Sequence, residues 1–458
     1  MEINNAFLEK YNKTGPRYTS YPPAPFFSTD YGNQHLIENI IQSNTENPQN
    51  ISIYIHIPFC PQLCHFCGCT TYTGAKASTI DTYIDALVKE IEFTAEKIDK
   101  TRTLTQVHWG GGTPNAISYK HIERITNVIK KHFKFSPNYE MAMECSPAYL
   151  SLDNIEQLAS YGFNRISLGV QDTKQDVLDA INRKGSRLPL KDLIAKMRAC
   201  NFKSINIDLV YGLPLQTVDS FSKTIDEIVA LNPDRIVTFS YAHVPNVMAR
   251  QKVLEEIGLP YPEQKIKMYQ NAYNIITEAG YTAVGMDHFA RPNDEIAIAL
   301  DEHKLHRNFQ GYCTRETTGQ VYGFGASSIS QLHSSYSQNF KVISKYIESI
   351  EANNLAVEKG YRLSKDEQIV REIINEIMCN YYLDFDSIAH QFEVTVDYIK
   401  TLVNYDLEKF EDFMDDQLIS ISGNIMTVHL MGRMVIRNIA MAFDPKLDKT
   451  KSQFSQTV

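Results

Sequence analysis

Short β-branched runs alternate with longer amphipathic stretches between residues 50 and 290, and this alternation constrains the fold more than any other feature. It is typical of parallel β/α architecture, in which a helix follows each strand. Strands are expected at 51–57, 106–109, 139–144, 165–170, 204–209, 235–241 and 282–286, with helices at 79–97, 152–160 and 219–230 among others. Six or seven such units predict an α/β fold: an incomplete TIM-like (β/α)6 barrel with its chemistry at the carboxyl ends of the strands.

With the segments before and after this region, the chain is predicted to consist of three parts. Residues 1–48 are expected to form an N-terminal extension that reaches the active site, residues 49–340 the barrel, and residues 341–458 a mainly helical domain. In that last part Ser364 to Glu367 is a capping box that predicts a helix start. Residues 418–422 and 425–429, joined by Gly423 and Asn424, predict a hairpin.

Helices followed by a hairpin are typical of a winged-helix module, which often binds DNA. The net charge of -9 argues against nucleic-acid binding here, because contact with phosphates needs a basic surface. We therefore expect this domain to cap the barrel, and the chain to be a monomer because the barrel already has an internal partner.

Composition is that of a globular enzyme, with 43% hydrophobic and 22% charged residues in 458. No apolar run approaches the roughly 18 to 20 residues of a membrane span, and the first residues lack the basic and apolar regions of a signal peptide. These features predict a cytoplasmic protein with reduced thiols and no membrane partner.

Three cysteines, Cys60, Cys64 and Cys67, follow the first expected strand at a C-x3-C-x2-C spacing. A loop with three thiolates can hold a 4Fe-4S cubane and leave one iron open for another ligand. Zinc is the alternative, because Cys69 completes a set of four thiolates and His65 is a spare ligand. Zinc sites usually pair two separated C-x2-C units, whereas all these residues lie within ten positions.

Polar or glycine residues also follow the next expected strands. The run Gly110 to Gly112 follows the second strand, Glu144 ends the third, Gln171 follows the fourth and Asp208 ends the fifth. They should therefore share one rim with the cysteines. Glycines allow close approach of a ligand and acidic side chains suit ribose hydroxyls, although a tight turn and ordinary loop residues would explain them too.

Cations and aromatic rings mix in segments 285–292 and 305–312, where Arg291, Arg307, Lys304 and His306 lie. Such a mixture suits a flat anionic substrate, and a solvated charged loop is the simpler alternative. Arg183 is a further cation near the rim, and it suits a carboxylate.

The cysteine spacing resembles that of the radical SAM enzymes, in which the open iron binds S-adenosylmethionine and its cleavage gives a 5'-deoxyadenosyl radical. Further matching stretches are 15–22, 60–69, 108–114, 206–209, 285–292 and 306–312. They narrow the resemblance, over nearly the whole chain, to a branch that acts in haem biosynthesis without oxygen. It implies an oxidoreductase that decarboxylates coproporphyrinogen III to protoporphyrinogen IX, turning the propionates of rings A and B into vinyl groups.

The resemblance also implies the site. Cys60, Cys64 and Cys67 would ligate the cluster, with Cys69 close by but not obligatory, and two molecules of S-adenosylmethionine would bind. Their implied contacts are Tyr54, Phe66, Gly111, Gly112, Thr113, Glu144, Gln171, Arg183, Asp208, Ala242 and Ile329. The substrate is expected at Arg17, Arg291, Arg307, Phe309 and Gln310. The electron donor and acceptor are unidentified, and no catalytic side chain is implied beyond the cluster and S-adenosylmethionine.

The sequence departs from this branch in one segment, where residues 145–148 are Cys-Ser-Pro-Ala instead of the expected Val-Asp-Pro-Arg. Three alternatives therefore stay open: a haem chaperone, a haem-degrading relative, and an enzyme of the same fold with another substrate. Haem chaperones typically lack both the fourth cysteine and the early Gly-Pro-Arg-Tyr segment, which this chain has.

Overall fold

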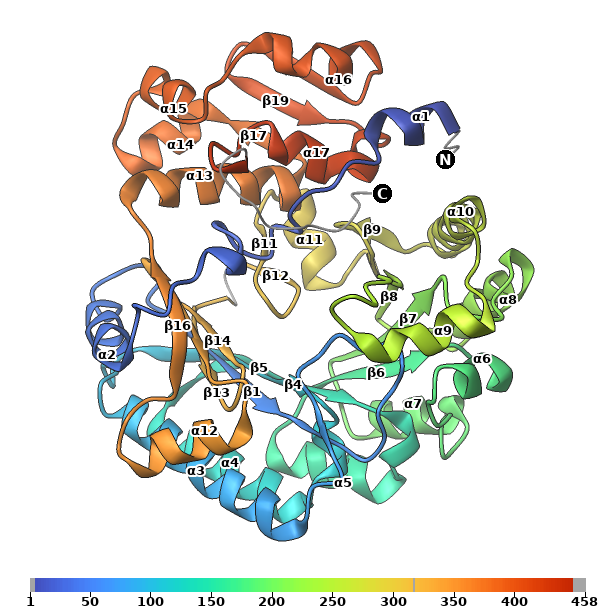
Figure 1. Cartoon of the computed structure of the whole chain (residues 1–458), viewed down its shortest axis with the longest axis vertical. Helices are drawn as coiled ribbons and strands as arrows, with labels where there is room; N and C mark the ends of the chain where they lie inside the picture. Colours follow the sequence, from blue (N-terminus) through green and yellow to red (C-terminus); the bar gives the residue numbers. More distant parts are fainter. Residues whose placement is uncertain (1–4, 316–317, 448–458) are drawn as a thin grey trace.

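The computed structural model describes residues 5–315 and 318–447. A mixed twelve-stranded sheet forms the centre of the protein (Figure 1). Its order is β16-β15-β14-β13-β1-β4-β5-β6-β7-β8-β10-β9. Its parallel part consists of β13, described below, and of six strands that alternate with helices along the chain: β1 (Ile51–Ile57), β4 (Thr103–Gly111), β5 (Lys134–Cys145), β6 (Arg165–Gln171), β7 (Ser204–Tyr211) and β8 (Arg235–Ser240). The alternation predicted these six strands, and the incomplete α/β barrel is confirmed.

Antiparallel strands extend the sheet at both edges and leave the barrel open. On one side β13 (Gln320–Phe324) pairs parallel with β1, and β14 (Ile329–Gln331), β15 (Ser335–Asn339) and β16 (Val357–Arg362) follow antiparallel. On the other side β10 (His288–Ala290) joins β8 to β9 (Thr282–Val284). The strand expected at 282–286 is present as β9, but it ends at Val284 and pairs antiparallel with β10 instead of directly with β8, because Gly285 at a φ of 66° turns the chain back into a hairpin.

Amphipathic helices cover the outer face of the sheet (Figure 1). They are α3 (Ala77–Ala95), α4 (Tyr119–His132), α5 (Leu152–Tyr161), α6 (Gln175–Ala180), α7 (Leu190–Ala199), α8 (Val218–Ala230), α10 (Pro262–Glu278) and α12 (Ile343–Glu351). The short turns η2 (Pro114–Ala116) and η3 (Pro147–Tyr149) follow β4 and β5, while η4 (Ala249–Gln251) and α9 (Lys252–Ile257) lie beside the cysteine loop. The apolar faces of the covering helices bury the β-branched side chains of the strands, as Ile55 and Ile57 illustrate at 0% exposure. None of the helices in the described ranges has the length and apolar character needed to span a membrane.

The N-terminal segment crosses from the C-terminal domain to the sheet (Figure 1). It contains α1 (Asn5–Tyr11), η1 (Ala24–Phe26) and α2 (Asn33–Gln42). The Tyr18 hydroxyl donates to Asp444 Oδ2 over 2.9 Å, and Ser28 forms a β-bridge with Gly360. The segment is thus fixed at both ends.

The C-terminal domain begins at the predicted capping box, where the Ser364 N–H donates to Glu367 Oε2 over 2.8 Å. Its elements are α13 (Lys365–Asn375), a π-turn η5 (Glu376–Asn380), β17 (Tyr382–Asp384), α14 (Phe385–Phe392), α15 (Val396–Leu402), η6 (Leu407–Phe410), α16 (Glu411–Asp415), β18 (Ile419–Ser422), β19 (Ile425–Val428), η7 (Gly432–Val435) and α17 (Ile436–Met441). The predicted hairpin is confirmed, and β17 adds a third strand to give a winged-helix-like arrangement.

One apolar core joins this domain to the barrel side. The core includes Ile373 and Ile439 of the domain, Tyr18 of the N-terminal segment, and Leu305 and Tyr312. The last two belong to a small hairpin of β11 (Leu305–Arg307) and β12 (Tyr312–Thr314), which follows α11 (Glu295–Asp301). The main sheet continues to Arg362, past the expected boundary at residue 340, and the division into domains stays a prediction.

Candidate active site

The cysteine loop begins where β1 ends and lies between two short parallel strands, β2 (Phe59–Cys60) and β3 (Tyr72–Thr73). Cys60, Cys64 and Cys67 are half-buried and line one cavity of about 1670 Å³. The Cys60 thiol lies 3.3 Å from the Thr113 hydroxyl. None of the eight cysteines, all within the described ranges, forms a disulfide.

Arginines surround this loop. The Arg183 guanidinium donates to the Cys64 sulfur over 3.5 Å, and Arg250 Nε donates to the Cys67 carbonyl over 3.1 Å. A hydrogen bond from Cys69 lowers the pKa of Cys67 to about 6, and the two arginines add to this effect. Burial raises the pKa of Cys64, against the effect of Arg183. The loop thus has positive charge beside thiols that must ionise to bind metal.

The donor set fits a three-cysteine iron-sulfur cluster. Each thiolate of a cubane binds a different iron, so the thiols need to face one cavity rather than meet at one point. They do so here, while in the described ranges no three His, Cys, Asp or Glu side chains converge as a single ion requires. Two arginines beside the loop suit a cluster whose thiolates are negatively charged.

The glycine run packs against the cysteine loop. The Gly112 N–H donates to the Ile57 carbonyl over 2.7 Å, and a Cβ on Gly112 would meet the Phe59 carbonyl at 2.7 Å. Gly111 has a φ of 110°, which favours glycine. These glycines therefore have a packing role besides leaving the backbone open to a ligand.

Glu144 of β5 and Asp208 of β7 both line the cavity, and β6 lies between their strands in the sheet. His108 Nε2 lies 2.9 Å from Glu144 Oε1, and the His108 ring stacks on Tyr54. Ser167 donates to Asp208 Oδ2 over 2.5 Å, while burial raises the pKa of Asp208. Each carboxylate keeps acceptor capacity toward the cavity, as binding of ribose hydroxyls requires.

The structure brings most of the predicted site residues to this cavity. Those that line it are Arg17, Cys60, Cys64, Phe66, Cys67, Gly111, Gly112, Thr113, Glu144, Gln171, Arg183, Asp208, Ala242, Arg307 and Gln310. Tyr54 lies one layer behind, with its hydroxyl 3.1 Å from His56 Nδ1. Ile329 and Phe309 pack on Tyr336 instead of facing the cavity.

Arg291 lies elsewhere. Its backbone N–H donates to the Asp234 carbonyl, just before the start of β8, and its guanidinium stacks 4.0 Å over Tyr281. That position is at the amino end of the strands, opposite the cysteine rim. Arg291 therefore does not line the cavity, and its stacking over Tyr281 is a packing contact.

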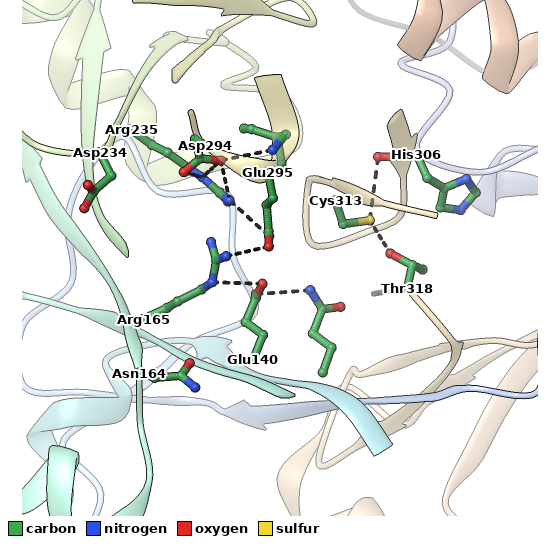
Figure 2. Close-up of polar contacts among 12 residues, drawn as sticks. Glu140, Asn164, Arg165, Asp234, Arg235, Asp294, Glu295, His306, Cys313 and Thr318 are labelled. Atoms are coloured by element: carbon green, nitrogen blue, oxygen red, sulfur yellow. Dashed lines mark hydrogen bonds and ion pairs between the residues drawn. The ribbon is translucent and has the colours of Figure 1, made fainter. Parts of the chain in front are cut away.

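A network of charges closes the amino end of the barrel (Figure 2). Arg165 Nε pairs with Glu140 over 3.0 Å and Arg165 Nη2 with Glu295 over 2.8 Å. Arg235 pairs with Asp294 over 2.8 Å and Glu295 over 3.2 Å. Burial opposes ionisation of Glu140, but Arg165 and Arg235 outweigh it and lower the pKa of Glu140. We call these five residues the floor network.

Sequence reasoning missed the floor network and a second set of cations. Arg433, Arg437 and Lys265 also line the cavity. Arg165 and Arg235 each begin a strand, which is a signal that could have placed them at the amino end. Arg433 and Arg437 come from a short helical region with no signal for what it faces.

Comparisons with known proteins agree with this geometry. Residues 54–228 match the model of the Radical SAM superfamily. Together with the open parallel barrel and the cysteine loop on its rim, the match defines a radical SAM protein.

Similarity extends well beyond that domain. The chain is 39% identical to the oxygen-independent coproporphyrinogen III oxidase of Escherichia coli over 99% of this chain and 98% of that protein, and 38% identical to the Synechocystis enzyme over 100% and 98%. A solved structure of Escherichia coli coproporphyrinogen III oxidase, described as a radical SAM enzyme, superposes with a TM-score of 0.90 at 37% identity over 97% and 99% of the two chains. The chain belongs to the family of oxygen-independent coproporphyrinogen III oxidases.

Proposed function

We propose that the protein converts coproporphyrinogen III to protoporphyrinogen IX in haem biosynthesis without oxygen. Each reacting propionate loses one hydrogen atom, one electron and carbon dioxide, and a vinyl group remains. Bound S-adenosylmethionine would supply the acceptor of the hydrogen atom, and a separate one-electron acceptor would take the electron. Family membership over the whole chain is the observation that carries this proposal.

Cys60, Cys64 and Cys67 would hold the cluster. When bound, the cluster and S-adenosylmethionine supply one-electron chemistry that removes a hydrogen atom from an unactivated carbon. Glu144 and Asp208 would accept hydrogen bonds from ribose hydroxyls, and Arg183 would bind a carboxylate. The two molecules of S-adenosylmethionine are part of the proposal, as are the monomer and the cytoplasmic location.

The size of the cavity and the residues that line it support this assignment. At about 1670 Å³ it exceeds the roughly 300 to 1,000 Å³ of typical ligand sites, as a macrocycle together with S-adenosylmethionine needs. The cysteine thiols lie on the same cavity as Arg17 and Arg307, so substrate carboxylates and the cluster can be reached from one bound position.

Anaerobic turnover with a reconstituted cluster tests the proposal. The assay supplies S-adenosylmethionine, a reductant and coproporphyrinogen III, and follows protoporphyrin and 5'-deoxyadenosine by mass. We expect both products, and loss of both in Cys64→Ser; Cys200→Ser, which changes a cysteine outside the cavity, is the matched control. Deoxyadenosine without decarboxylated product would contradict the substrate, haem binding without turnover would favour a chaperone, and ring opening of haem would favour a haem-degrading enzyme.

A further inference from the structure

Five cationic side chains line the part of the cavity that faces the C-terminal domain, and they come from four separate segments. Arg17 belongs to the N-terminal segment, Lys265 to α10, Arg307 to β11, and Arg433 and Arg437 to η7 and α17. We call them the cation face. They lie close enough that Arg17 and Arg307 add to the effect of burial in lowering the pKa of Arg437, to about 10. Folding has therefore gathered like charges.

The cation face differs from the floor network in its partners. In the described part of the chain, no Asp or Glu lies within ion-pair distance of Arg17, Lys265, Arg307 or Arg433. The Asp287 carboxylate also lines the cavity, where Arg307 and Arg17 help to lower its pKa, but it already accepts from His288 Nδ1 over 2.6 Å. Such a concentration of positive charge costs folding free energy, and a bound anion would offset that cost.

Neutral groups hold these side chains in place. Arg307 Nη1 donates to the Arg17 carbonyl over 3.0 Å, Lys265 Nζ to the Tyr241 carbonyl over 3.0 Å and Arg437 Nε to the Pro16 carbonyl over 2.9 Å. The Arg433 guanidinium lies 4.3 Å over the Tyr381 ring. Carbonyls and rings orient a cation without cancelling its charge. The Nε atoms of Arg307 and Arg433 are buried and have no hydrogen-bond partner among the described residues.

We propose that Arg433 and Arg437, together with Lys265, Arg17 and Arg307, bind the substrate carboxylates, so that the C-terminal domain forms part of the substrate site. This inference rests on the proposed function, in which the substrate has four propionates. Guanidinium groups bind carboxylates through paired hydrogen bonds, and several such groups around one cavity suit a polyanion better than a monocarboxylate. Binding of the substrate carboxylates also explains why a protein with a net charge of -9 keeps these five cations on one face.

Binding of coproporphyrin III tests the role of Arg433. This stable, oxidised ring has the same four propionates, and its fluorescence reports binding to the anaerobic holoenzyme. Loss of a charge-assisted hydrogen bond should weaken binding about tenfold or more in Arg433→Gln, and Arg433→Lys should recover part of the loss. Arg124→Gln, which removes an exposed charge on α4, is the matched control and should bind as the wild type does.

The outcomes separate the two proposals. If the wild type binds coproporphyrin III and Arg433→Gln and Arg437→Gln both bind within twofold of it, the cation face is not the carboxylate site. If the wild type does not decarboxylate coproporphyrinogen III in the anaerobic turnover assay, the proposed function fails. Thermal unfolding and binding of S-adenosylmethionine should stay at wild-type values in Arg433→Gln, and a loss of either would assign the residue a structural role instead.

Discussion

Two groups of arginines line the same cavity, and their surroundings differ. In the floor network, Arg165 and Arg235 are each 13% exposed and form ion pairs with Glu140, Asp294 and Glu295. In the cation face, Arg307 and Arg433 meet carbonyls and rings but no carboxylate among the described residues. A buried arginine with acidic partners stabilises the fold through ion pairs, whereas a buried arginine without such partners is available to bind an anionic ligand. An arginine in a cavity is therefore interpreted by its partners rather than by its position.

The largest effect should come from breaking the floor network at Arg235. Arg235→Met would leave the buried Asp294 without its ion-pair partner and Glu295 with Arg165 alone, which costs about 3–5 kcal/mol in the free energy of unfolding. Denaturant unfolding measures this loss. A change below about 1 kcal/mol would mean that the two groups of arginines do not differ as we argue.

Glu90 is a buried carboxylate that has hydrogen-bond donors but no ion-pair partner among the residues that the structure describes. It accepts from Tyr346, Asn339 and the Gly325 N–H, and burial raises its pKa from 4.5 to about 7. The folded state thus keeps a proton that the unfolded chain loses above about pH 4.5, so this stabilisation is present at low pH and is lost as the pH rises to about 7. The loss amounts to about 3 kcal/mol.

Unfolding curves of the wild type and Glu90→Gln between pH 4.5 and 8 isolate this contribution. The difference in free energy between the two proteins should change with pH up to about 7 and then stay constant. Parallel curves over the whole range would show that Glu90 does not titrate in this window.

Arg165→Lys tests the geometry of the floor network with its charge kept. Arg165 reaches Glu140 and Glu295 through two different nitrogens, and a lysine can pair closely with one of them. We expect a loss of about 1–2 kcal/mol by denaturant unfolding. A loss as large as that of Arg235→Met would show that shape, rather than charge, dominates there.

The smallest effect on stability should come from the cation face. Arg433→Gln breaks no ion pair and loses a contact over Tyr381, so the free energy of unfolding should change by less than about 1 kcal/mol. A loss of several kcal/mol in the same unfolding measurement would place Arg433 with the structural arginines.

Local sequence predicted the elements whose signals are local. The apolar run Ile51 to Ile57 is a strand with those bounds, and the capping box at Ser364 starts a helix. By contrast, β15 has the polar sequence Ser-Tyr-Ser-Gln-Asn, yet all five residues are buried in a strand that pairs with β14 and β16. Pairing over long distances leaves no trace in such a segment.

The same limit applied to the candidate site. Cysteines and glycines that follow successive strands could be placed on one rim, because parallel strands end at the same edge. The cation and aromatic pattern at Arg291 looked like that at Arg307, yet Arg291 stacks on Tyr281 outside the cavity and Arg307 lies within it. Arg433 could not be placed, because no local signal tells how a C-terminal domain docks.

The docking of the two chain ends sets an order of events during synthesis. The Tyr18 hydroxyl donates a hydrogen bond to Asp444, and Arg437 donates one to the Pro16 carbonyl. The N-terminal segment, which contributes Arg17 to the cavity lining, is therefore held by residues made more than 400 positions later. The parallel strands β1 and β4 to β8 can pair once residue 240 has left the ribosome, but the N-terminal segment has its anchors only when translation is nearly finished. A newborn chain therefore has its cysteine loop before its cavity is enclosed, which leaves an interval in which iron and sulfide can reach the thiols.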